Sequence, residues 1–279
     1  MLGTLKHASF IRGDLQNPDS LRSLVEGADA IIHCAGSVRG ATQAQFDRVN
    51  VDGTRNLLDA IKVGGAPPRL LVFSSLAARE PHLSFYATSK YRAEQLLKGE
   101  ADGIAWTVLR PPAVYGPGDR ELLPLFRYMA HGIALVAGSP RSRFSMIYVE
   151  DLSAAVISWL RANTLSEKIY ALDDGKANGY DWHELSTVVG EICGRKVRIV
   201  QPPSWLLDFP AWLNRLLARI TGGSPMLTPE KLRELRHPDW VCNNAEFQQD
   251  IDWQPGVALP EGLQATPDWP GHRRRNCAA

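Results

Sequence analysis

Two side chains with complementary proton chemistry are four residues apart in the segment Tyr86-Ala87-Thr88-Ser89-Lys90. In a helix, residues at this spacing share one face, so the phenol of Tyr86 and the ammonium of Lys90 would lie one turn apart. A phenol has a pKa of about 10 and is a weak acid-base group at neutral pH, but a nearby cation favours its ionised form. The pair could therefore exchange a proton with a substrate oxygen.

A hydroxyl pair precedes this segment. Ser74 and Ser75 follow the apolar run 69–73, at the point where a predicted strand ends. A hydroxyl in that place could polarise a substrate carbonyl or alcohol. A Tyr-x-x-x-Lys spacing alone arises by chance in many helices, and its position one short loop after a strand ending in Ser-Ser makes it more specific.

Apolar runs bounded by turn residues alternate with helix-like segments through the first two-thirds of the chain. The predicted strands are 30–34, 69–73 and 105–110, and the predicted helices are 18–25, 46–63 and 84–98. Strands that are apolar throughout and separated by helices indicate a parallel sheet covered on both faces. We therefore predict a doubly wound α/β fold, which binds its ligands at the carboxyl ends of the strands.

Composition excludes several other classes of protein. The chain has 279 residues and a formal net charge of +1, so a basic nucleic-acid-binding protein is not expected. No run of eighteen apolar residues occurs, and we expect no transmembrane helix. Its four cysteines have no CxxC spacing and its seven histidines no ligand spacing, so no metal site is predicted. Cys34 is predicted to be buried, and the thiols to be reduced in the cytoplasm.

The pattern of apolar runs and turn residues changes near residue 169. We predict an incomplete dinucleotide-binding domain over 1–168, a smaller substrate-binding lobe over 169–269 and a disordered tail over 270–279. The stretch 205–220 is apolar, and it is either a lid over a pocket or core or a helix at a membrane surface. The lid is favoured because the stretch lacks a dense cationic face. Trp205, Trp212 and Trp240 are accordingly expected in the core or the lid.

Polar residues outside the Tyr-Lys segment have simpler predicted roles. Asp119 and Asp151 are expected to cap turns or a helix. Arg141 and Arg143 could bind a substrate phosphate or could lie in a solvated loop, and the sequence leaves both alternatives open.

Several motifs occur in a fixed order: Gly13-Asp14-Leu15, 29–36, Asn50-Val51-Asp52-Gly53-Thr54, and Leu109-Arg110-Pro111-Pro112-Ala113-Val114-Tyr115-Gly116. Together with Tyr86 and Lys90, they resemble the extended short-chain dehydrogenase/reductase family, of the NAD-dependent epimerase/dehydratase type. The resemblance extends from about Phe10 to Trp269, and the loop 109–119 is its most specific match.

The resemblance implies NAD or NADP as cofactor and hydride transfer as the chemistry. Tyr86 would be the general acid/base, Lys90 would lower its pKa and hold the nicotinamide ribose, and Ser75 would bind the reacting oxygen, with Ser74 as the alternative. The cofactor-binding residues would be Asp14, Leu15, Ala35, Gly36, Asn50, Tyr86, Lys90, Pro111, Ala113 and Val114.

The substrate would be a small molecule, either a nucleotide-sugar or a hydrophobic alcohol or ketone, and the Trp-rich stretch slightly favours the latter. Relatives often dimerise through helices that correspond to 46–63 and 84–98, so the resemblance is compatible with a homodimer. A non-catalytic relative serving as a scaffold, assembly or sensing protein is the alternative function.

One expected motif is missing. Folds of this kind open with a strand, a GxxGxxG turn and a helix that binds the pyrophosphate, and no such spacing occurs near the start. The residue that determines whether such a fold selects NAD or NADP is missing as well. Residues 8–14 look like the third strand of the sheet. A truncated product, a protein without cofactor binding and a partner-supplied unit are the three explanations, of which the first is favoured. We expect weak dinucleotide affinity and poor stability.

Overall fold

The main sheet of the protein is parallel and has the strand order β1-β2-β3-β8. The computed structural model describes residues 8–64, 66–162, 167–221, 223, 225, 227–267 and 269, apart from the side chains of 219 and 220. The strands are β1 (Ala30–His33), β2 (Arg69–Phe73), β3 (Trp106–Arg110) and β8 (Lys168–Ala171). The predicted parallel α/β sheet is therefore confirmed.

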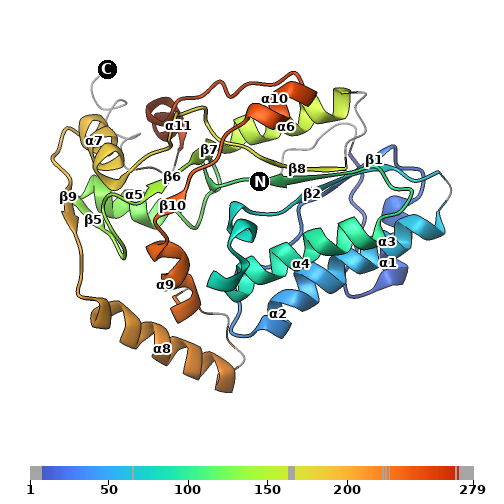
Figure 1. Ribbon diagram of the computed structural model, residues 1–279, viewed down its shortest axis with the longest axis horizontal. Coiled ribbons are helices and arrows are strands. Elements are labelled where there is room, and N and C mark those ends of the chain that lie inside the picture. Colours follow the sequence, from blue (N-terminus) through green and yellow to red (C-terminus); the bar gives the residue numbers. More distant parts are fainter. Residues whose placement is uncertain are drawn as a thin grey trace.

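Helices cover both faces of this sheet (Figure 1). One face is covered by α1 (Pro18–Val25), α3 (Gly53–Val63) and α4 (Phe85–Glu100), and the other by α6 (Val149–Arg161) and α10 (Ala245–Asp250). Leu70 packs with the first group, and its neighbour Leu71 packs with the second. Successive residues of a strand point to opposite faces, so an apolar run such as 69–73 fills two cores.

The predicted helix 46–63 is built in three parts. Helix α2 (Gln43–Asp47) continues through a π-helical turn, Arg48–Asp52, into α3. Single π-helical turns often occur at functional sites, and this one carries the buried side chain of Asn50.

Residues 8–14 do not form the predicted third strand. Phe10 and Ile11 are 80% and 51% exposed, and β1 pairs only with β2 among the described residues. A strand needs a neighbour to accept its backbone hydrogen bonds, and β1 is the edge of the sheet here. Ile32 of β1 is 39% exposed at this edge. Cys34, which follows β1, is also exposed, so the expectation that it is buried was wrong.

A second lobe packs against the carboxyl ends of the main strands. It contains three two-stranded pairs: β4 (Ala113–Tyr115) with β7 (Met146–Tyr148), β5 (Ile133–Leu135) with β9 (Arg198–Val200), and β6 (Arg143–Phe144) with β10 (Asp239–Trp240). Its helices are α5 (Leu123–Ala130), α7 (Trp182–Cys193), α8 (Ser204–Thr221), α9 (Pro229–Arg236) and α11 (Leu259–Ala265).

The second lobe is assembled from segments on both sides of residue 168. Strands β4 and β7 precede that residue, whereas β8 lies at it and returns the chain to the main sheet beside β3. The predicted tail 270–279 lies outside the described residues.

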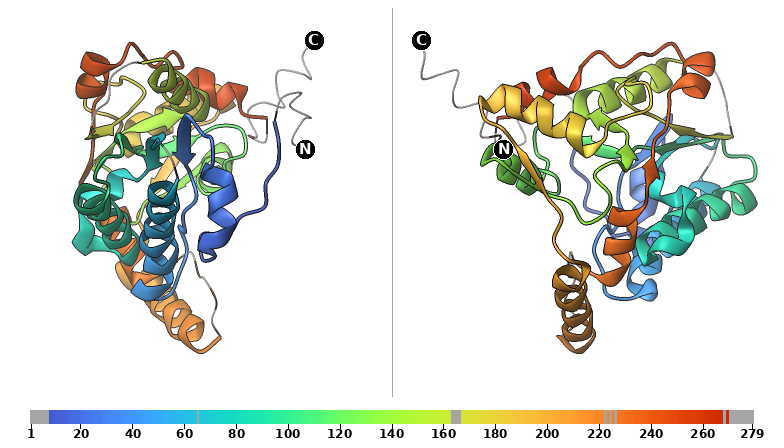
Figure 2. Two further views of the ribbon diagram at one scale, coloured as in Figure 1. Left: turned by 90° about the vertical axis from the view of Figure 1, so that its right-hand side faces the viewer. Right: turned by 60° about the vertical axis from the view of Figure 1, so that its left-hand side comes forward.

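Helix α8 projects from the body of the molecule (Figure 2). Trp205 and Trp212 are 68% and 48% exposed, so the expectation of a core position was wrong for these two side chains. Trp240 is half-buried, and its indole nitrogen donates to the carbonyl oxygen of Glu234 at 2.9 Å.

Candidate active site

Helix α4 begins next to the carboxyl end of β2 and brings Tyr86 to Ser75. The hydroxyl of Ser84 caps the helix by accepting from the backbone N–H of Ala87 at 2.9 Å, which places Tyr86 in the first turn. Ser75 begins a short 3₁₀ helix, Leu76–Arg79, and its side chain is hydrogen-bonded to that of Tyr86.

Ser74 points elsewhere. It is 7% exposed, and its hydroxyl donates to a carboxylate oxygen of Glu94 at 2.5 Å. Of the two candidate hydroxyls, the structure therefore brings Ser75 to the phenol of Tyr86, while Ser74 belongs to a buried polar group behind it.

Lys90 lies one turn further along α4 and is buried. Its Nζ donates to the carbonyl oxygen of Phe73, the last residue of β2, at 2.9 Å. Burial lowers the pKa of Lys90 to about 8, although the carboxylate of Glu94 opposes this shift. The ammonium is therefore fixed at the carboxyl end of the strand.

The pKa of Tyr86 is raised, and burial is the largest cause. The hydrogen bond with Ser75 and the charge of Lys231 lower it, and the charge of Glu234 raises it. Lys231 is thus a cation near Tyr86 that the sequence did not predict, in addition to Lys90, whose ammonium donates to Phe73.

Helix α9 holds Lys231 and Glu234 at the start of α4. The hydroxyl of Ser84 donates to the Glu234 carboxylate, and Nε of Arg233 donates to the carbonyl oxygen of Leu83 at 2.9 Å. Lys231 Nζ donates to the other Glu234 oxygen at 2.8 Å. Sequence reasoning missed both residues, because an ion pair at i, i+3 on a helix gives no sign of a distant tyrosine.

Gly36, Asn50 and Lys90 form a cradle beside these groups. A Cβ atom at Gly36 would lie 3.0 Å from Lys90 Nζ and 3.2 Å from Asn50 Oδ1, so a side chain here would crowd both groups. Asn50 Nδ2 donates to the hydroxyl of Ser89 at 2.8 Å, and its Oδ1 accepts from the backbone N–H of Ser37 at 2.7 Å. The loop after β1 is thus tied to α4.

A second group of buried polar side chains lies next to Lys90. Glu94, 1% exposed, accepts from the guanidinium of Arg110 through Nε at 2.8 Å and also through Nη2. His33 lies 3.3 Å from the hydroxyl of Thr54, and burial lowers its pKa to about 4. The side chains of His33, Thr54 and Glu94, with Lys90, line a small cavity at the ends of β1 and β2.

The remaining predicted cofactor residues have structural contacts. The Asp14 carboxylate accepts from the backbone N–H of Gln16 at 2.9 Å, and the Leu15 carbonyl accepts from Asn56 at 2.7 Å. The Pro111 carbonyl accepts from the backbone N–H of Leu76 at 2.9 Å. Ala113 and Val114 lie in β4, each packed against a hydrophobic core. Ala35 lines the small cavity.

The donor set fits one half of a nicotinamide dinucleotide. A hydroxylated ring could reach Tyr86 and Lys90, and the bare backbone at Gly36 leaves room for it to approach. The other half needs a pyrophosphate cradle, and no GxxGxxG turn occurs within the described ranges. The described residues therefore fit the nicotinamide-ribose half of the cofactor, and they do not include a binding turn for its pyrophosphate.

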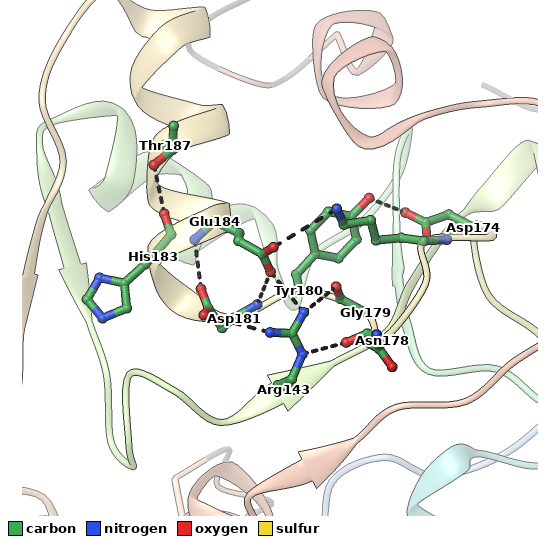
Figure 3. Close-up of polar contacts among 10 residues, drawn as sticks. Arg143, Asp174, Asn178, Gly179, Tyr180, Asp181, His183, Glu184 and Thr187 are labelled. Carbon is green, nitrogen blue, oxygen red and sulfur yellow. Dashed lines mark hydrogen bonds and ion pairs between the residues drawn. The ribbon is translucent and has the colours of Figure 1, made fainter.

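Arg143 is held inside its own lobe (Figure 3). Its Nε donates to the carbonyl oxygen of Asn178 at 2.6 Å, and its Nη2 donates to Gly179 and to Glu184, both at 3.1 Å. Gly179 has a φ of +59° and passes so close to the backbone of Phe144 that a Cβ would lie 2.5 Å from its oxygen. Two of the three nitrogens of this guanidinium are therefore hydrogen-bonded within the lobe.

Asp119 and Asp151 bind backbone N–H groups. Asp119 accepts from Glu121 at 2.8 Å and from Leu122 at 3.0 Å, which is the predicted turn cap. Asp151 accepts from Gly256 at 2.9 Å and from Val257 at 3.0 Å, so it fixes the C-terminal segment to α6.

Two features are absent from the part of the chain that the structure describes. No group of three or more His, Cys, Asp or Glu side chains there could hold a metal ion. Nor does any helix there have the length and apolar character needed to cross a bilayer.

The sequence is similar to those of known proteins. Residues 2–172 match the model of the NAD dependent epimerase/dehydratase family. The chain is 36% identical over 259 residues to the ceramide reductase of Caulobacter vibrioides, which covers 93% of this chain and 79% of that protein. It is 25% identical to the sterol-4-alpha-carboxylate 3-dehydrogenase ERG26 of Saccharomyces cerevisiae, over 93% of this chain and 82% of the relative.

Solved structures share the fold. RMD from Pseudomonas aeruginosa, complexed with NADPH, superposes with a TM-score of 0.69 at 22% identity, covering 96% of this chain and 93% of that one. MoeE5 in complex with UDP-glucuronic acid and NAD superposes with a TM-score of 0.67 at 19% identity, over 95% and 85% of the two chains. The family match covers more than half of the chain. The chain therefore belongs to the NAD-dependent epimerase/dehydratase family.

Proposed function

We propose that this protein is an NAD(P)-dependent oxidoreductase that interconverts a secondary alcohol and a ketone on a hydrophobic, lipid-like substrate. The observation that carries the proposal is the hydrogen-bonded pair of Ser75 and Tyr86 at the carboxyl end of β2, with the Lys90 ammonium fixed one turn below. The similarity to a ceramide reductase over 93% of the chain supports the substrate class.

The bound nicotinamide supplies or accepts the hydride at the substrate carbon. In the reductive direction, Tyr86 gives its phenolic proton to the substrate oxygen while that oxygen gains the electron pair of the carbonyl π bond. Ser75 donates a hydrogen bond to the same oxygen and holds it against Tyr86. In the oxidative direction, the phenolate of Tyr86 removes the proton from the alcohol.

In this scheme the buried ammonium of Lys90 binds a ribose hydroxyl of the cofactor. Its position close to Gly36 and its hydrogen bond to the carbonyl oxygen of Phe73, at the end of β2, support this role. The raised pKa of Tyr86 favours the protonated phenol at neutral pH, which is the form that a reductase needs.

Epimerisation or dehydration of a nucleotide-sugar is the second candidate, since a fold neighbour is complexed with UDP-glucuronic acid. The contacts of Arg143 favour the first candidate over this one. A nucleotide-sugar carries a diphosphate. Of the two guanidiniums that the sequence offered for it, that of Arg143 is bound to Asn178, Gly179 and Glu184, and that of Arg141 is exposed.

Turnover and binding measured on the same samples test the proposal. We expect NADH or NADPH oxidation with a long-chain 3-keto amide, and none with a UDP-sugar. Tyr86→Phe should abolish turnover and retain cofactor binding by calorimetry, whereas the control Tyr91→Phe, on the exposed side of α4, should retain both.

Three results would count against this assignment. An active Tyr86→Phe variant would remove the tyrosine from the chemistry. Absence of NAD(H) and NADP(H) binding would favour the non-catalytic alternative, and turnover of the UDP-sugar alone would favour the second candidate.

A further inference from the structure

Helix α8 has its polar side turned toward the protein. The carboxylate of Asp208 pairs with Arg236 of α9 at 2.8 Å, and the guanidinium of Arg215 pairs with Glu230 of α9 at 2.8 Å. Ala211 and Ala218 are buried on the same side. An ordinary surface helix packs its apolar side inward, so the amphipathic orientation of α8 is reversed.

The outward side of α8 is a continuous apolar stripe. It consists of Trp205, Phe209, Trp212, Leu213, Leu216 and Leu217, which are 37% to 68% exposed. Their spacing of three, four and seven residues places them along one side of the helix. Because α8 projects from the body of the molecule, this stripe forms a ridge rather than the floor of a groove (Figure 2).

We infer that the apolar stripe of α8 docks the protein on the surface of an anionic lipid bilayer. Tryptophan, phenylalanine and leucine on one side of a helix are typical of helices that lie at the boundary of headgroups and acyl chains. A projecting ridge can enter this boundary without a complementary groove. Because no helix of the described residues is long and apolar enough to cross a bilayer, the contact is with its surface.

The charges next to the stripe complement anionic lipids. Of the basic side chains of α8 and α9, Arg233, Lys231 and Arg236 are 51%, 41% and 31% exposed. Of the acidic side chains, Glu230 and Glu234 are each only 7% exposed, and Asp208, the partner of Arg236, is 48% exposed. Three exposed basic side chains are thus set against one exposed acidic side chain on the described part of this helix pair, and each basic group near an anionic surface adds to binding.

The docking surface is continuous with the candidate site. Helix α9 pairs with α8 through Arg236 and Glu230, and it places Lys231 and Glu234 beside Tyr86. A bilayer at the stripe would thus lie one helix away from the site. This step rests on the proposed function, because only a lipid-like substrate gains from reaching the site directly from a bilayer.

Co-sedimentation of the full chain with vesicles tests the inference without any turnover. We expect binding to vesicles of phosphatidylcholine and phosphatidylglycerol at 7:3, and weaker binding to phosphatidylcholine alone or at high salt. The variant Trp205→Ser/Phe209→Ser/Trp212→Ser should bind at least about tenfold more weakly. The control Val63→Ser/Tyr128→Ser/Ile133→Ser removes exposed apolar side chains elsewhere and should bind like the wild type.

A second measurement covers the case that the variant is unstable. Bromine on the acyl chains quenches tryptophan that enters the boundary, so quenching should be seen in the wild-type protein and in the single variant Phe209→Ser. It should be reduced in Trp205→Phe/Trp212→Phe, which keeps the stripe apolar.

The inference is overturned if the wild-type protein does not bind the anionic vesicles or if the control loses binding equally. It is also overturned if sedimentation shows a dimer that depends on the stripe and excludes vesicles. Vesicle binding without ketone reduction would leave the docking surface intact and refute only the proposed function.

Discussion

The Lys231 ammonium lies 2.8 Å from a Glu234 carboxylate oxygen, and both charges act on the phenol of Tyr86. The second Glu234 oxygen accepts from Ser84, the residue that begins the helix carrying Tyr86. An ion pair from α9 is therefore fixed at the same helix end that positions the proposed acid/base. The second lobe thus contributes to the electrostatics of the site as well as to its walls.

Replacement of Lys231 by methionine should raise the pKa of Tyr86. The variant removes the cation that lowers this pKa and leaves the Glu234 charge, which raises it. Selective ¹³C labelling of tyrosine Cζ, with Tyr86→Phe to assign the signal, measures the shift by NMR. If alcohol oxidation requires the phenolate, its rate at neutral pH should fall about tenfold per unit of pKa rise.

The matched control for this measurement is Lys98→Met, which removes an exposed ammonium at the far end of α4. It should leave the Tyr86 signal unchanged. An unchanged Tyr86 titration in Lys231→Met would mean that this ammonium does not influence the phenol.

Replacement of Glu94 by glutamine should destabilise the protein strongly. Its buried carboxylate accepts from Arg110 and Ser74, and the variant leaves the Arg110 guanidinium without its counter-charge. Breaking one partner of a buried pair costs about 3 kcal/mol of unfolding free energy. Chemical denaturation monitored by circular dichroism gives this value.

Glu100→Gln is the comparison for Glu94, because Glu100 pairs with Arg55 at 3.2 Å with both side chains 42% exposed. Water and salt already screen this pair, so its loss should cost less than about 1 kcal/mol. Equal losses in the two variants would show that burial does not decide the contribution of the Glu94 pair.

The strands and the Tyr-Lys spacing could be predicted because both depend on local patterns. Strand β2 and helix α1 have the predicted bounds, since apolar runs and turn residues determine them. The partner of Lys90 could not be predicted. A four-residue spacing places Lys90 on the same face as Tyr86, but burial and the free carbonyl of Phe73 determine where its ammonium points.

Long-range contacts explain the other differences. Residues 8–14 were predicted as a strand, but β1 pairs with β2 alone among the described residues. The stretch 205–220 was correctly predicted as a helix, whereas its orientation depends on Asp208 and Arg215 finding partners in α9. Neither partner can be identified from the sequence of the helix itself.

Replacement of Arg143 by methionine should destabilise the second lobe without weakening substrate binding. The variant loses the hydrogen bonds to Asn178, Gly179 and Glu184, which together hold the loop between β8 and α7. We expect a loss of about 1–3 kcal/mol in unfolding free energy.

The control is Arg141→Met, at an exposed position two residues earlier, which should change the unfolding free energy by less than about 0.5 kcal/mol. A large rise in KM for Arg143→Met at unchanged stability would instead indicate a substrate phosphate at this guanidinium.

Acid should destabilise the protein through His33. Burial lowers its pKa from about 6.5 to about 4 in the folded state, so between these pH values the unfolded chain binds a proton that the folded chain does not. Stability due to this group is therefore present above pH 6.5 and is lost as the pH falls to 4. The full effect is about 3 kcal/mol.

In His33→Gln, the unfolding free energy should fall less between pH 7 and pH 4.5 than in the wild-type protein. His82→Gln removes an imidazole that is 72% exposed, and its unfolding free energy should fall as much as that of the wild-type protein. Urea denaturation gives the unfolding free energy at each pH. If it falls by the same amount between these pH values in His33→Gln and in the wild-type protein, His33 is not the group that the acid protonates on unfolding.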